Sequence, residues 1–247
     1  MLHMKNVSKV FRTEMVETHA LRALDLEVNA GEFVAVTGPS GSGKTTFLNI
    51  AGLLEELSSG EYLLDGVDVK SLDDRARSKL RNEKIGFVFQ SFNLIPDLNL
   101  FDNVDVPLRY RKMSRGERKK RIESALERVG LASRVRHFPA ELSGGQQQRV
   151  AIARAIAGDP TLLLADEPTG NLDSAMAREV MQLLEELNEQ GTIVVIVTHD
   201  PEIAARTRRN VHIVDGVAAD LERAPALVTP ASTSKSKREG DSARTTI

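Results

Sequence analysis

The sequence predicts an α/β fold with a mainly parallel core sheet, an antiparallel β subdomain and a helical arm. Residues 162–165 and 193–197 are continuous apolar runs, which are typical of parallel strands covered on both faces. Residues 33–37 form a third apolar run, and a glycine-rich loop followed by a helical segment comes directly after it. Residues 2–28 alternate polar and apolar side chains, which indicates half-buried antiparallel strands.

Composition limits the classes of function that the chain can have. Its 247 residues suit one large α/β domain, and with 41% hydrophobic and 28% charged residues a packed core is expected. Lysine plus arginine (33) nearly balances aspartate plus glutamate (35), and tryptophan is absent, so nothing points to nucleic acid as a partner. Cysteine is also absent, which excludes disulfides and thiolate metal sites.

No apolar run approaches the roughly 20 residues that a membrane-spanning helix requires. The start of the chain also lacks the apolar stretch of a signal peptide. Any role at a membrane is therefore expected to depend on a partner protein.

The segments between these runs continue the α/β pattern. Those predicted from local sequence are a helix over 44–54, a strand and turn over 61–66, a helix over 70–84, a strand over 85–89 and a final hairpin strand over 211–216. Residues 1–221 form the predicted domain. The composition then shifts to Ala, Pro, Ser, Thr and basic residues, so residues 222–247 are predicted to be a mobile tail.

Residues 91–142 are expected to form the helical arm. Ser114 and Glu117 have the spacing of a capping box, which predicts the start of a helix. Its apolar face and its terminating glycine are Ile122, Ala125, Leu126, Val129 and Gly130.

The glycine-rich loop after residues 33–37 fits the full phosphate-binding pattern G-x-x-x-x-G-K-[ST]. Its residues are Gly38, Pro39, Ser40, Gly41, Ser42, Gly43, Lys44 and Thr45, with Thr46 next. Backbone N–H groups of such a loop converge on phosphate oxygens, and the helix that follows adds the positive end of its dipole. Lys44 is expected to reach the terminal phosphates of ATP, and Thr45 to give a hydroxyl to Mg²⁺.

Two acidic residues follow the apolar run 162–165, which is expected to lie beside the strand 33–37. Asp166 would emerge at the tip of its strand and orient Mg²⁺. Glu167, one residue further, can face the attacking water as a general base.

Residues Ser143, Gly144, Gly145 and Gln146 open a helix about 20 residues before Asp166. A helix start with bare amides, a serine hydroxyl and no bulky side chains is a second anion site. One chain then has two phosphate-binding helix ends and only one lysine-bearing loop. If two copies are arranged head to tail, the second helix start of each copy can contact the ATP held by the other copy. Both phosphate-binding helix starts then have a ligand.

Together these motifs resemble the nucleotide-binding domain of ABC transporters over roughly residues 1–217, since Leu142–Gln146 reads as the family signature LSGGQ. The resemblance implies a P-loop NTPase fold, ATP hydrolysis and a dimer. It also implies four further site residues. They are Gln90 as a glutamine that contacts Mg²⁺ and water, Asp173 at the dimer interface, His199 on the γ-phosphate, and Phe11 stacked on adenine in place of the more usual tyrosine.

Flanking residues resemble the macrolide-exporter and lipoprotein-releasing branch. The resemblance rests on residues 86–90, 92–96, 146–151 and 165–173. It implies an integral membrane permease as partner and a peripheral place on the cytoplasmic face of the inner membrane. It also implies export of a hydrophobic or amphipathic molecule, such as an antimicrobial peptide, haem, lipoprotein or drug. A non-transporting signalling complex powered by the same ATPase is the alternative.

Two surfaces of the arm have open interpretations. Apolar residues beside Gln90 either dock a permease helix or form the core of the arm, and these are Phe92, Leu94, Ile95, Leu98 and Leu100. The basic segment 109–121 is either a solvated helix face or a contact with anionic lipid headgroups.

Overall fold

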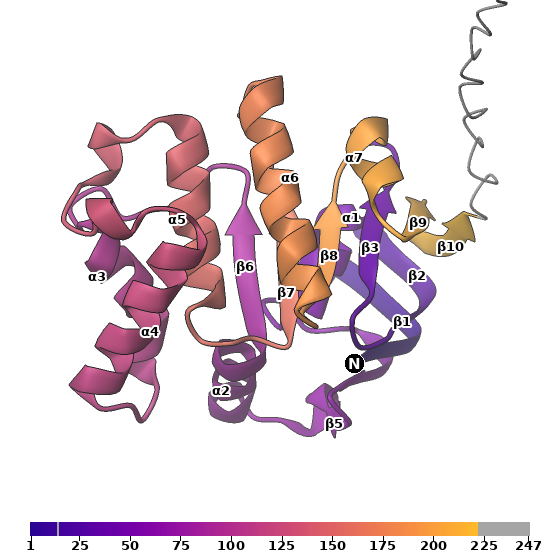
Figure 1. The fold of residues 1–247 in the computed structure, drawn as a ribbon. Coiled ribbons are helices and arrows are strands. Elements are labelled where there is room, and N and C mark those ends of the chain that lie inside the picture. Colours follow the sequence, from indigo (N-terminus) through magenta and orange to yellow (C-terminus); the bar gives the residue numbers. More distant parts are fainter. Residues whose placement is uncertain (14, 222–247) are drawn as a thin grey trace, which may run out of the picture.

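The structure is a computed structural model that describes residues 1–13 and 15–221. A six-stranded sheet with the order β10-β9-β3-β8-β7-β6 forms the centre (Figure 1). Its strands are β3 (Phe33–Thr37), β6 (Ile85–Phe89), β7 (Leu162–Asp166), β8 (Ile193–Val197), β9 (Arg209–Val214) and β10 (Val217–Leu221). All neighbouring pairs are parallel except β9 and β10, which form the expected final hairpin.

Both faces of this sheet are buried, which explains the unbroken apolar runs. In β8, Val194 and Ile196 pack with α5, α6 and the arm, whereas Val195 and Val197 pack with α1 and the second sheet. Side chains that alternate between two cores leave no polar position in the sequence. The predicted parallel strands are confirmed.

The predicted position of β7 beside β3 is wrong. Strand β8 lies between them and pairs with both, while the other neighbour of β7 is β6. The reason is the crossover through α6 (Ser174–Glu189), which returns the chain to form β8 against β3. With strands about 4.8 Å apart, β7 and β3 are roughly 10 Å apart within the same sheet.

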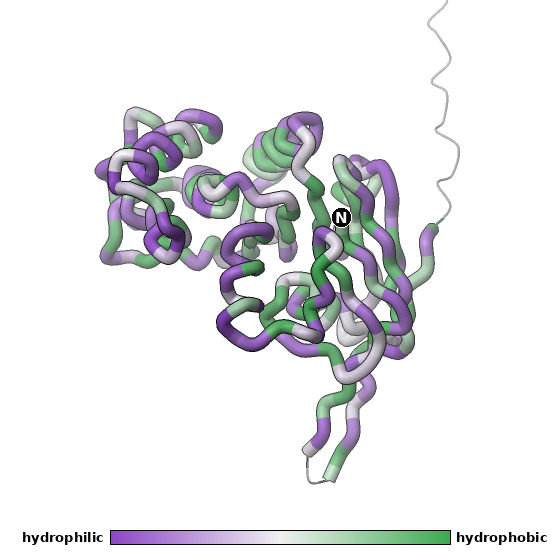
Figure 2. Tube along the Cα trace, turned by 90° about the horizontal axis from the view of Figure 1, so that it is seen from below, coloured by the Kyte–Doolittle hydropathy of each residue, from purple (hydrophilic) through white to green (hydrophobic). Residues whose placement is uncertain are grey.

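A second, antiparallel sheet has the order β2-β1-β4-β5. Its strands are β1 (Leu2–Arg12), β2 (Glu17–Val28), β4 (Ser59–Leu64) and β5 (Val67–Asp68). Figure 2 shows the β1–β2 hairpin extending away from the body of the molecule, with hydrophobic and hydrophilic residues alternating along it. The antiparallel subdomain predicted for residues 2–28 is confirmed. Asp65 and Gly66, both with positive φ, make the turn between β4 and β5.

The remaining elements are mostly helical. They are α1 (Lys44–Ala51), η1 (Val69–Ser71), α2 (Asp74–Lys84), α3 (Leu100–Asp105), η2 (Val106–Tyr110), α4 (Arg115–Arg128), η3 (Ala132–Arg134), η4 (Pro139–Glu141), α5 (Gly144–Ile156), α6 and α7 (Pro201–Arg206). The predicted helices over 44–54 and 70–84 are shorter than expected, because α1 ends before Gly52 and α2 begins after the Asp73 cap.

The arm is less regular than the predicted helical segment 91–142. Residues 91–99 form an irregular segment with short turns. Phe92 and Asn93 have φ of 61° and 50°, a left-handed conformation that a right-handed helix does not contain. The helix predicted from Ser114 is confirmed as α4, whose Glu117 N–H donates to the serine hydroxyl. The Glu117 carboxylate pairs with Arg121.

Within the described residues, no helix combines the length and the apolar character needed to cross a membrane. The predicted mobile tail over 222–247 lies outside the described residues.

Candidate nucleotide-binding site

The loop from Gly38 to Thr45 joins β3 to α1 and is wedged between the two sheets. A Cβ atom on Gly38 would lie 2.1 Å from the carbonyl oxygen of Ile213 in β9, and one on Gly43 would lie 2.4 Å from that of Ala20 in β2. Both glycines also have positive φ, 144° and 107°. Glycine is therefore required here for conformation and for close approach.

The start of α1 is open to an anion. Gly43 caps the helix without a side chain, and the first turn has no acidic residue. The helix dipole and unpaired amides thus face the loop. The Lys44 ammonium donates to the carbonyl oxygens of Gly38 (2.8 Å) and Pro39 (2.7 Å), which places its charge over the loop. The Ser42 hydroxyl is buried and has no hydrogen-bond partner among the described residues.

Asp166 ends β7 at the carboxyl edge of the same sheet. Burial raises the pKa of its carboxyl group, the neighbouring Glu167 charge raises it further, and the charge of Lys44 opposes both. Ionising a half-buried carboxylate is unfavourable, and a bound cation would stabilise the negative charge. The position of Asp166 therefore suits a cation site.

Glu167 and His199 form a direct pair across the edge between β7 and β8. Glu167 has φ of 45°, and its N–H donates to the Val197 carbonyl (2.9 Å). Its carboxylate oxygen Oε1 lies 2.6 Å from His199 Nδ1, and Oε2 lies 3.5 Å from the Thr198 hydroxyl. The hydrogen bond to Glu167, and then its charge, raise the pKa of His199. The structure therefore brings together the expected base and the expected γ-phosphate ligand.

Gln90 follows β6 and reaches the turn after Glu167. Its Nε2 donates to Asn171 Oδ1 (3.4 Å), and Asn171 Nδ2 donates back to the Gln90 carbonyl (3.0 Å). A Cβ on Gly170 would lie 2.6 Å from Gln90 Nε2, so this contact depends on glycine. Asp173 caps α6 by accepting from the N–H groups of Ala175 and Met176.

Residues Ser143–Gln146 form a complete capping box at the start of α5. The Ser143 hydroxyl accepts from the Gln146 N–H (3.4 Å), and the Gln146 side chain accepts from the Ser143 N–H (3.1 Å). Gly144 and Gly145 leave the first turn without side chains. Among the described residues, no hydrogen bond joins this helix end to the loop 38–45.

Phe11 lies near the end of β1, and 41% of its surface is exposed. It pairs with Thr18 of β2, two residues from Ala20, against which Gly43 packs. At about 3.3 Å per strand residue, Phe11 is roughly 7 Å along the strand from the phosphate loop. The Lys9 ammonium lies 4.9 Å from its ring centroid.

Two side chains of α5 with contacts near the site were not found from the sequence. Buried Gln148 donates to the Pro168 carbonyl (2.6 Å), next to Glu167. Arg154 donates to the carbonyl oxygens of Phe92 and Asn93, in the turn after Gln90. In the sequence both residues look like ordinary polar positions of a helix, and their contacts become apparent only from the packing of α5 beside β6.

The fold and this site together define a P-loop nucleotide-binding protein of the α/β class. A family model described as ABC transporter matches residues 21–170. The chain belongs to the ABC transporter family, as an ATP-binding subunit with the ATPase domain of that family.

Individual relatives agree with this assignment. An uncharacterized ABC transporter ATP-binding protein, YknY of Bacillus subtilis, is 49% identical over 216 residues, covering 87% of this chain and 94% of the relative. The macrolide export ATP-binding/permease protein MacB of Bdellovibrio bacteriovorus is 41% identical over 99% of this chain, which spans 37% of that longer protein. The ATP-binding cassette MJ0796, solved as a dimer in a post-hydrolysis state with ADP and Pi, is 44% identical with a TM-score of 0.81, covering 90% and 100% of the two chains.

Proposed function

We propose that two copies of this ATPase drive the export of a hydrophobic or amphipathic molecule through a separate integral membrane permease. The observation that carries this proposal is the match over 99% of the chain to MacB, a protein named for macrolide export that also includes a permease part. A pyoverdine export protein, PvdT of Pseudomonas fluorescens, is 51% identical over 81% of the chain. The chain would act at the cytoplasmic face of the inner membrane, where ATP is available.

A second copy completes the nucleotide site in this proposal. Gly144 and Gly145 themselves carry no side chains, and among the described residues no hydrogen bond joins this end of α5 to the loop 38–45 of its own chain. The dimeric state of MJ0796 supports the same arrangement. In the closed dimer, Ser143–Gln146 of one copy would face the phosphates held by the other, and Asp173 would lie at the interface.

Each residue then has a defined task. The loop 38–46 and Lys44 hold the phosphates, Phe11 contacts the base, Glu167 polarises the attacking water, and His199 contacts the γ-phosphate. The 2.6 Å distance between His199 Nδ1 and Glu167 Oε1 supports a shared role of these two residues in the reaction.

The residues present also fit Mg²⁺. Thr45, Asp166 and Gln90 offer hydroxyl, carboxylate and amide oxygens, which are the donors that this cation prefers. The raised pKa of Asp166 shows that its negative charge lacks full compensation from the protein. When bound, Mg²⁺ would neutralise charge on the phosphates, and these three residues would hold it.

The permease would dock beside Gln90. Ile95 is exposed there and is available for such a contact, whereas Leu100 is fully buried and belongs to the core of the arm. In the basic segment 109–121, Arg109 and Arg118 form ion pairs with Asp105, which supports a role of these two side chains within the arm over contact with lipid.

Co-purification from native membranes tests the proposal. A tagged chain is expected to bring down one multi-spanning membrane protein, and Ile95→Glu is expected to lose it while keeping ATP hydrolysis. Val67→Glu, at an exposed position in β5, serves as the control. Recovery of soluble proteins alone would contradict the transporter role. Cargo movement in vesicles containing the pair separates export from the signalling alternative.

A further inference from the structure

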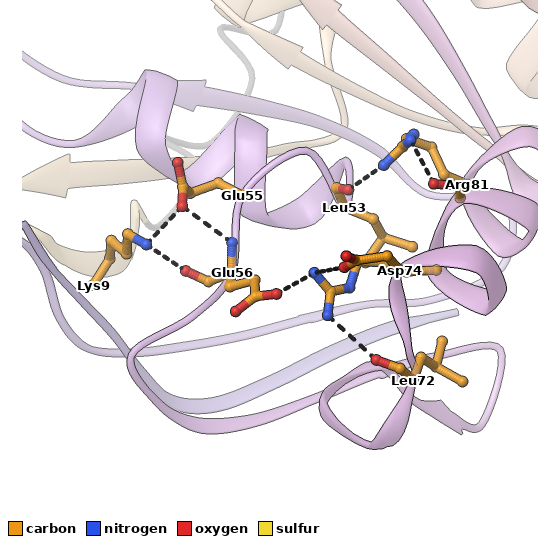
Figure 3. Close-up of polar contacts among 9 residues, drawn as sticks. Lys9, Leu53, Glu55, Glu56, Leu72, Asp74 and Arg81 are labelled. Atoms are coloured by element: carbon orange, nitrogen blue, oxygen red, sulfur yellow. Dashed lines mark hydrogen bonds and ion pairs between the residues drawn. The ribbon is translucent and has the colours of Figure 1, made fainter.

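The ammonium group of Lys9 is held between an aromatic ring and two oxygen acceptors. Its Nζ lies 4.9 Å from the centroid of Phe11, 2.7 Å from the Glu55 carboxylate and 2.8 Å from the Glu56 carbonyl oxygen. Figure 3 shows Lys9 reaching from β1 to both acceptors, which lie after the end of α1. Only 12% of the Lys9 side chain is exposed, so water competes weakly for the charge.

The oxygen acceptors fix the position of this cation. The hydrogen bond from Lys9 is the main interaction that lowers the pKa of Glu55, so the carboxylate stays ionised opposite the ammonium. Phe11 has no hydroxyl with which to anchor its ring, and the Lys9 cation on one side limits the orientations that it can adopt. Phe11 keeps 41% of its surface exposed, which leaves part of the ring accessible to a ligand.

We propose that Lys9 positions Phe11 and polarises its ring as the platform for the purine base of the bound nucleotide. This inference rests on the proposed function, because it requires Phe11 to contact the base. A cation on one face of a ring draws π density toward itself, so the opposite face repels a second π system less. Lys9 would therefore strengthen stacking of an electron-rich purine without touching it.

The position of the pair relative to the phosphate loop supports this role. Phe11 is roughly 7 Å along the strand from the point where Gly43 packs on β2. A nucleotide with its phosphates at the loop can reach that distance with its base. The Lys9 ammonium is directed toward Glu55 and Glu56. We therefore expect Lys9 to affect the binding of the base and not the binding of the phosphates.

Two ligands separate positioning of the base from general damage to the site. Titration calorimetry with Lys9→Met is expected to show Mg·ATP binding weakened about two- to five-fold, and inorganic Mg·triphosphate binding unchanged. Lys9→Arg, which keeps a cation, is expected to retain most of the ATP affinity. Lys5→Met, exposed on the same strand, is the matched control and should alter neither affinity.

Equal weakening of both ligands by Lys9→Met, or unchanged ATP affinity, would overturn the inference. The variant Phe11→Ala distinguishes a wrong role for Lys9 from a wrong assignment of Phe11 as the residue that contacts the base. If Phe11→Ala weakens ATP binding and Lys9→Met does not, Phe11 remains the base contact and Lys9 has no part in it. If Lys9→Met still weakens ATP binding in the Phe11→Ala background, the ring is not the route of its effect. If neither variant changes ATP affinity, the assignment of Phe11 falls as well.

Discussion

The Nδ1 atom of His199 lies 2.6 Å from Oε1 of Glu167, although the two residues come from the ends of different strands. The His199 ring is largely exposed, whereas Glu167 is mostly covered. The contact exists because the backbone N–H of Glu167, which has φ of 45°, donates a hydrogen bond to the carbonyl oxygen of Val197 in the neighbouring strand. The strained residue at the end of β7 is thus aimed at the end of β8.

This pair has a measurable titration. The hydrogen bond and charge of Glu167, with a smaller contribution from Asp200, raise the pKa of His199 above its ordinary value of 6.5, while the slight burial of the ring and the charge of Lys44 act in the opposite direction. An NMR titration of the His199 ring should therefore give a midpoint above 6.5, and Glu167→Gln should lower it. Glu202→Gln, on nearby α7, is the control. An unchanged midpoint in Glu167→Gln would show that the pair does not form in solution.

The same pair has a consequence for stability. Because its pKa is raised in the folded chain, protonated His199 stabilises the fold fully below the unfolded value near 6.5. That contribution disappears as the pH rises through the raised pKa. Urea unfolding of wild type and Glu167→Gln should therefore differ more at pH 6 than at pH 9.

Glu167→Gln should also separate binding from chemistry. The amide keeps the shape of the side chain and loses the base, so turnover is expected to fall by at least about 10²-fold while ATP still binds. Phosphate release measures the first quantity and calorimetry the second. Near-normal turnover would remove Glu167 from the role of base. With ATP bound and hydrolysis blocked, a dimer should persist in size-exclusion chromatography.

The local motifs could be predicted from the sequence because each rests on short-range chemistry. The loop Gly38–Thr45 needs glycines at set positions, and Ser114 and Ser143 cap their helices through residues three further along. Apolar runs likewise revealed β7 and β8. These predictions did not depend on how the elements pack in space.

The order of the strands and the course of residues 91–99 could not be predicted in the same way. Whether β7 or β8 lies beside β3 depends on the crossover through α6, and the apolar runs of both strands are buried, so apolar character does not distinguish them. The turn at Phe92 and Asn93 has positive φ at two bulky or polar residues, and Arg154 of distant α5 holds its carbonyl oxygens. Local secondary-structure propensity cannot predict such a contact between residues distant in the sequence.

Ser143→Arg tests closure between two copies. A long cation at the glycine end of α5 should block the approach of the partner, so hydrolysis is expected to be lost while the monomer binds ATP normally. The change also removes the α5 cap, which costs about 0.5–2 kcal/mol of stability. Ser114→Ala removes the corresponding cap of α4 and should leave hydrolysis intact. Weaker ATP binding by monomeric Ser143→Arg, with the fold retained, would place Ser143 in the site of its own chain.

Gly86→Ala tests how tightly β6 is held against α5. An added Cβ would lie 2.6 Å from the Ala155 carbonyl oxygen and 3.0 Å from a methyl group of Leu163, and neither the α5 backbone nor the packed core can yield without cost. Overpacking of this kind is expected to lower the free energy of unfolding by about 1–3 kcal/mol. Gly116→Ala in α4 meets nothing within 4 Å and should be neutral or stabilising by up to about 1 kcal/mol. Urea unfolding compares the two variants. Equal stability of the two variants would show that β6 and α5 pack less closely than the structure indicates. Because β6 ends directly before Gln90, Gly86→Ala should also reduce turnover more than it reduces ATP affinity.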